Sequence, residues 1–268
     1  MNKFFVILAA LFVILACEDV IEVDVPKDTT RLSIDALIRL NTDSQTTRLQ
    51  VRANETTSFF EEIGPALLNR IQIVVTSTNT IIDLVEEPLG SGIYVADWST
   101  EELIEGELLL TLDYNNEQYE ARNTFVPTVP FDALRQGEGT LFSGDETEII
   151  VSYTDDPDRI DFYLFDFDFN EFLVSEDTFY QGQAFEFSYF YEDGLKPGKE
   201  LTISIMGVNE GFYNYMNQLI VQSGGDQGPF QTPAATVKGN IINTTAPNNF
   251  ALGYFAISQE FIDTIIIE

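Results

Sequence analysis

Alternation of apolar and polar residues with a period of two dominates the first half of the chain. It is clearest from Thr47 to Ala53, where Leu49 and Val51 alternate with Arg48, Gln50 and Arg52. Successive side chains of a strand point to opposite faces, so the charged residues share one face of a half-buried strand. Further β-rich runs, separated by turn signals, lie at 32–36, 71–76, 80–85, 92–97, 107–114 and 118–125. This succession of short strands predicts an antiparallel β-sandwich.

The second half continues with strands predicted at 147–154, 160–173, 184–192 and 200–208. Within 160–173, alternation places Phe165, Phe167 and Phe169 inward and the intervening polar residues toward solvent. Strands are also predicted at 237–242, 251–258 and 261–267. The last of these ends in an apolar β-branched run that would promote aggregation if exposed, so we expect it to be paired within a sheet.

One segment changes to helical spacing. Phe212, Met216 and Leu219 recur on one face, Asn209 stands at an N-cap position, and Gly224 follows as a stop signal. The pattern predicts a helix over 209–223 that buries these three side chains. The opposite face, with Asn214, Asn217 and Gln218, is uncharged, and we expect it to be exposed where a partner protein could approach without charge repulsion. A solvated helix that only covers a sheet is the alternative.

The proline-bracketed stretch 126–130 is the best internal boundary. We therefore predict a mainly β chain of two antiparallel β-sandwich-like domains. The first, 17–126, would be immunoglobulin-like or transthyretin-like, and the second, 127–268, would carry the inserted helix.

The N-terminus has the form of a lipoprotein signal peptide. Lys3 precedes an apolar run over 4–16 that ends at Ile14-Leu15-Ala16-Cys17. The run is shorter than the roughly 20 residues needed to span a bilayer, and Ala16 is a suitable cleavage position. We predict a signal peptide over 1–16 and lipidation of Cys17, which would anchor the protein in a membrane. An ordinary secretory peptide with an incidental cysteine is the alternative.

Composition excludes several classes of chemistry. The 268 residues include 44 Asp and Glu, 13 Lys and Arg, one Cys and no His, for a formal charge of -31. Histidine-dependent catalytic triads and Cys/His zinc sites are therefore absent. The acidic balance also excludes nucleic acid as a partner, because such binding needs clustered cations.

The densest acidic stretch contains Asp155, Asp156 and Asp158. This composition leaves open only a hard cation on oxygen ligands as a cofactor, and Ca²⁺ is the candidate that such a stretch would suit. Like charges repel and no cage glycine is present, so we favour a solvated acidic face and expect no cofactor.

No hydrolase, kinase, P-loop or dinucleotide-binding motif occurs in the sequence. Two carboxylates suffice for a glycosidase, but 44 acids supply such pairs by chance, so composition gives no support for one. Phe185, Phe187 and Tyr189 share a strand face and Phe190 lies on the other, where a ring could stack on a sugar or peptide. We favour core packing for this aromatic cluster.

Several short motifs resemble the Bacteroidota outer-membrane lipoproteins grouped as domain of unknown function 4249. The resemblance covers most of the chain after Ala16, with one departure at Lys199-Glu200, where an acidic residue would come first. It is carried by Cys17-Glu18-Asp19-Val20-Ile21, the segment 119–130, Asp156-Pro157 before Phe162-Tyr163, Leu195-Lys196-Pro197-Gly198, Phe212-Tyr213-Asn214-Tyr215, Gly228-Pro229-Phe230, Pro233, Gly239-Asn240-Ile241 and Leu252-Gly253-Tyr254-Phe255.

The resemblance implies a cellular location and a function. Members are often encoded beside TonB-dependent receptors, and acidic residues after the lipidated cysteine imply export to the outer face of the outer membrane. We therefore expect a non-enzymatic surface lipoprotein that captures a ligand for, or gates, such a receptor in nutrient uptake. The alternatives are an adhesin-like or calcium-stabilised surface module and a carboxylate-based glycan hydrolase. The family has no established catalytic residues, so none is assigned here.

Overall fold

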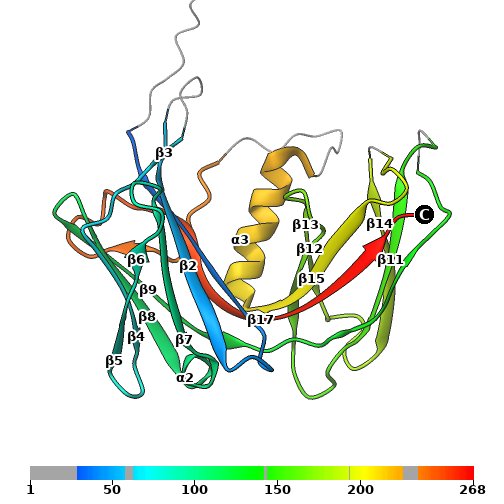
Figure 1. Cartoon of the computed structure of the whole chain (residues 1–268), viewed down its shortest axis with the longest axis horizontal. Coiled ribbons are helices and arrows are strands. Elements are labelled where there is room, and N and C mark those ends of the chain that lie inside the picture. The colour runs from blue at the N-terminus through cyan, green and yellow to red at the C-terminus, as the bar shows by residue number, and fades with distance from the viewer. Residues whose placement is uncertain (1–28, 58–62, 142–143, 193, 226–234) are drawn as a thin grey trace, which may run out of the picture.

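The computed structural model describes residues 29–57, 63–141, 144–192, 194–225 and 235–268. Two β lobes flank a central helix, and one long strand, β17 (Leu252–Ile266), runs below the helix from one lobe to the other (Figure 1). The predicted fold class is confirmed: the chain is mainly β and sandwich- or barrel-like, with an inserted helix.

The first lobe is a curled sheet in the order β5-β4-β8-β9-β17-β1-β2-β7-β6. Alternating residues point into one core that includes Ile34, Leu49, Ile73, Leu110 and Phe255. The short helix α2 (Thr100–Ile104) follows β7, and β3 and β16 pair at the margins. The strands of this lobe are β1 (Leu32–Leu40), β2 (Thr46–Glu55), β3 (Gly64–Pro65), β4 (Arg70–Val75), β5 (Thr80–Asp83), β6 (Val85–Glu86), β7 (Ile93–Ser99), β8 (Glu107–Tyr114), β9 (Glu117–Val126) and β16 (Ile242–Asn243).

The second lobe packs two sheets against each other. A three-stranded sheet in the order β10-β11-β14 faces β12, β13 and β15, and the core between them is rich in aromatic rings, among them Tyr153, Phe165 and Phe187. The predicted inward face of Phe185, Phe187 and Tyr189 packs against this core. The strands are β10 (Phe131–Gln136), β11 (Thr147–Thr154), β12 (Phe162–Asp166), β13 (Phe172–Glu176), β14 (Ala184–Tyr191) and β15 (Glu200–Val208).

The long strand β17 (Leu252–Ile266) belongs to both lobes. Its first part pairs in parallel with β1 and β9, and its second part pairs antiparallel with β15. The terminal apolar run is therefore paired within a sheet, as expected. The division into domains 17–126 and 127–268 stays a prediction; β17 and Ile241, from the second segment, complete the core of the first lobe.

Helix α3 (Glu210–Ile220) lies between the lobes and continues into one π-helical turn, Val221–Gly225. The predicted N-cap is confirmed, because the Asn209 side chain accepts a hydrogen bond of 2.8 Å from the Phe212 amide. Phe212 packs with Leu164, Met206, Val208 and Ala256 in a third core. Both faces of the later part of β15 are consequently buried.

Four sequence-based details are wrong. The segment 160–173 is a hairpin rather than one strand, because Asp168, Phe169 and Asn170 adopt positive φ and turn the chain. Phe169 is consequently 45% exposed instead of inward. The predicted strand 237–242 is reduced to β16, and the two predicted C-terminal strands are one continuous β17.

Candidate functional site

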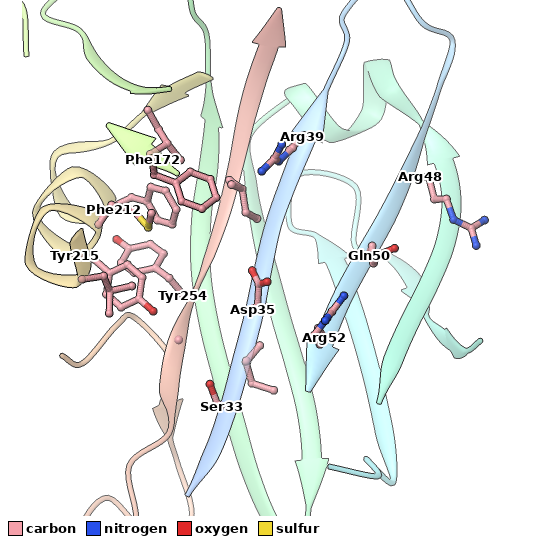
Figure 2. A pocket seen from close by; sticks show the side chains of 16 residues that line it. Ser33, Asp35, Arg39, Arg48, Gln50, Arg52, Phe172, Phe212, Tyr215 and Tyr254 are labelled. Carbon is pink, nitrogen blue, oxygen red and sulfur yellow. The ribbon is translucent and has the colours of Figure 1, made fainter. Parts of the chain in front are cut away.

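A cavity of about 550 Å³ separates helix α3 from the outward face of β1 and β2. We call it the α3 groove. Its size lies in the range of small-molecule sites, which is about 300–1,000 Å³. Figure 2 shows aromatic side chains from α3, β17 and β13 on one side, and polar side chains from β1 and β2 on the other. The groove therefore offers two chemically different walls.

The aromatic wall is built around Phe212, Tyr215 and Tyr254. Ring centroids are 4.9 Å apart for Phe212 and Tyr254, and 5.2 Å apart for Tyr215 and Tyr254. These edge-to-face and tilted arrangements hold the rings in place. Phe172 and Met216 also line the cavity, together with Leu219. Leu219 is 36% exposed, so the expectation that it would be buried with Phe212 is wrong: its side chain borders the groove rather than the core.

The polar wall follows directly from the alternation of the strands. Arg48, Gln50 and Arg52 alternate with buried residues on β2, and Asp35 and Arg39 do the same on β1. The sequence correctly predicted that the charged residues of β2 share one face. It did not predict that this face would lie opposite a helix more than a hundred residues later, since periodicity identifies a face but not what covers it.

Two arginines that line the groove form ion pairs with acidic residues that do not line it. Arg39 forms ion pairs with Asp166 at 2.8 Å and Glu260 at 3.2 Å. Arg48 pairs with Glu87 at 2.9 Å and lies farther from the aromatic wall (Figure 2). Their positive charges are therefore largely compensated within the fold.

Asp35 and Arg52 are directly opposed partners on neighbouring antiparallel strands, and both line the groove. Burial of Tyr215, together with the nearby Asp35 carboxylate, raises the pKa of Tyr215 to about 12. The Tyr215 hydroxyl is therefore protonated at neutral pH and can donate a hydrogen bond into the groove.

The predicted acidic residues do not converge on one point. Asp155 is buried, and its carboxylate accepts hydrogen bonds from the Tyr163 hydroxyl and the Gly182 amide. Asp156 instead forms an ion pair of 3.1 Å with Arg159. Among the described residues, no cluster of three or more Asp, Glu, Cys or His has a geometry suited to a metal ion. Asp155 and Asp156 thus serve local hydrogen bonds and an ion pair, and the Asp158 amide donates to the Asp156 carboxylate at 3.0 Å. The expectation of a solvated acidic face is wrong for Asp155, which is buried.

The predicted partner-binding residues Asn214, Asn217 and Gln218 are all exposed on α3. They lie on a different side of the helix from Phe212, which faces the third core. Cys17 lies outside the described residues, and so does most of the glycine- and proline-rich loop that follows the helix.

The sequence from residue 18 to residue 262 matches the family described as a domain of unknown function, DUF4249. The chain belongs to the DUF4249 family. Since the match covers most of the chain, both lobes and helix α3 are parts of one DUF4249 unit. No curated protein matches this DUF4249 sequence. Within the residues that the structure describes, none of the helices of this DUF4249 protein is both long and apolar enough to cross a bilayer.

Proposed function

We propose that this protein is a non-enzymatic lipoprotein of the outer membrane, anchored through Cys17 and facing the cell exterior, that captures a small ligand for a TonB-dependent receptor. The α3 groove is the observation that carries this proposal. It combines an aromatic wall with a polar wall, as binding sites for small molecules commonly do. Ligand capture needs no catalytic group, and among the described residues no hydrogen bond joins a hydroxyl that lines the groove to a carboxylate.

The position of the groove supports capture followed by release. One wall belongs to the first lobe and the other mainly to α3, whose outward face carries Asn214, Asn217 and Gln218. A receptor that contacts this neutral face would lie beside the bound ligand. In a chain with a formal charge of -31, an uncharged face is also where a partner meets least repulsion.

A growth experiment with paired helix variants tests the proposal. Leu219→Trp fills the groove from its edge, whereas Asn217→Trp adds the same ring on the exposed face two residues away. A deletion strain grown on a panel of sole carbon, nitrogen and iron sources should fail on at least one of them. Asn217→Trp should restore that growth and Leu219→Trp should not. If no source distinguishes the deletion strain, or if Leu219→Trp restores growth fully, the proposal is wrong.

A further inference from the structure

Arg52 and Asp35 stand out from the other charged residues of the groove. Both are exposed, and in the described part of the chain neither side chain has an ion pair or a hydrogen bond. All other described arginines contact a carboxylate or an aromatic ring: Arg31, Arg39, Arg48, Arg70, Arg122, Arg135 and Arg159. The groove therefore presents one available cation and one available anion side by side.

The spacing of these two charges limits the ligand. Directly opposed residues of antiparallel strands have Cα atoms about 4.5–5.5 Å apart. Their charged groups can therefore contact two neighbouring groups of one small molecule. A ligand with a single charge would leave the other groove charge facing an apolar body without a partner, which is unfavourable. A ligand with adjacent carboxylate and ammonium groups satisfies both residues.

We propose that the α3 groove binds a zwitterionic ligand of the α-amino acid type, with its carboxylate on Arg52, its ammonium group on Asp35 and an aromatic or apolar side chain against Tyr215 and Tyr254. A guanidinium group suits a carboxylate because it can donate two parallel hydrogen bonds. The aromatic rings add favourable contact with both the apolar body and the ammonium group. This inference rests on the proposed ligand-capture function and specifies the class of ligand.

Three probes with the same indole body test the assignment on the full chain in detergent. Tryptophan carries both charges, indole-3-propionate lacks the ammonium group, and tryptamine lacks the carboxylate. Calorimetric titration at neutral pH should show tryptophan binding about tenfold more tightly than either analogue, as expected for the loss of one charge-assisted contact.

Two charge-removing variants assign each contact separately. Arg52→Gln should weaken tryptophan and indole-3-propionate but not tryptamine, whereas Asp35→Asn should weaken tryptophan and tryptamine but not indole-3-propionate. Arg135→Gln removes another exposed arginine, paired with Glu186 in the second lobe, and should change none of the affinities.

The inference is overturned if none of the probes binds, if an analogue binds as tightly as tryptophan, or if either variant weakens all three probes equally. A natural ligand of another charge type, recovered from the groove, would also overturn it while leaving the proposed capture function intact.

Discussion

Gly253 on β17 is the register partner of Ile34 on β1, and its φ of +95° belongs to a region that residues other than glycine rarely adopt. A Cβ atom at this position would collide with the Ile34 carbonyl oxygen. Ile34 and Gly253 both line the groove, so a shift of β17 relative to β1 would also change the shape of the groove.

Gly253→Ala should lower the free energy of unfolding by more than about 2 kcal/mol, because backbone strain and a collision with a main-chain atom act together. Gly198→Ala is the matched control, since Gly198 also has a positive φ (+84°) but has open space around it. That variant should lose only about 1 kcal/mol. Denaturant titration of both variants measures the difference, and equal losses would show that the collision contributes nothing.

A second residue-scale property concerns Asp177, which is buried near Asp155 and Asp161. Burial, followed by repulsion from these two carboxylates, raises the pKa of Asp177. The folded state therefore binds a proton more readily than the unfolded state, and stability falls as pH rises through the range between the two pKa values.

The Asp161 amide donates a hydrogen bond of 2.7 Å to the Asp177 carboxylate. Asp177→Asn removes the charge and keeps an oxygen that can accept this bond. We expect the variant to melt a few degrees above the parent at about pH 7, with the advantage shrinking as pH falls toward about 4, the ordinary aspartate pKa, and absent below it. Asp158→Asn, at an exposed position, should show little change. An advantage that does not vary with pH would rule out the titration of Asp177 as its cause.

At the scale of elements, the local sequence identified some features of the strands and the helix, but it did not show that β17 is one continuous strand. The alternation in β2 correctly identified its exposed and buried faces, and Asn209 correctly marked the start of α3. By contrast, Gln259 and Glu260 interrupt the apolar pattern of β17 without ending the strand. Their side chains contact residues around the crossing from one lobe to the other: Gln259 accepts from the Thr128 amide, and Glu260 pairs with Arg39. The local alternation of apolar and polar residues gives no information about these partners, which are distant in the sequence.

The outward face of α3 gives a prediction at the same scale. The double variant Asn214→Glu and Gln218→Glu adds two charges at exposed positions, so thermal stability should change little. Co-purification with the proposed TonB-dependent receptor should fall, because the added charges would repel an acidic or neutral partner surface at the contact. A folded double variant that co-purifies like the parent would exclude this face as the receptor contact.

At the scale of the whole molecule, the lobes and α3 form the groove together. The sequence predicted the fold class and the helix, but the groove was not predicted, because its walls come from β1, β2, β13, α3 and β17. Arg52, Asp35 and Tyr254 are brought together by the pairing of β1 with both β2 and β17, and the packing of Tyr215 on Tyr254 adds the helix. The charged face of β2 and the aromatic residues of α3 were the available signals in the sequence, and neither specifies which other surface it meets.

Anchoring is a separate property of the whole molecule. Cys17→Ala should release the protein from membranes, because the proposed lipid is the only anchor that we assign. Fractionation after a high-salt wash measures this, with the wild-type chain as the reference. A Cys17→Ala protein that still sediments with membranes would contradict lipid anchoring, although it would not affect the groove.

Ligand capture in the α3 groove is the central claim, and native mass spectrometry of the protein extracted from its own membrane tests it most directly. We predict a non-covalently bound small molecule on the wild-type chain and on Asn217→Trp, and its absence from Leu219→Trp. A wild-type protein that carries no bound molecule, even after exposure to growth medium, or a Leu219→Trp protein that carries the same molecule at the same occupancy, would contradict the claim.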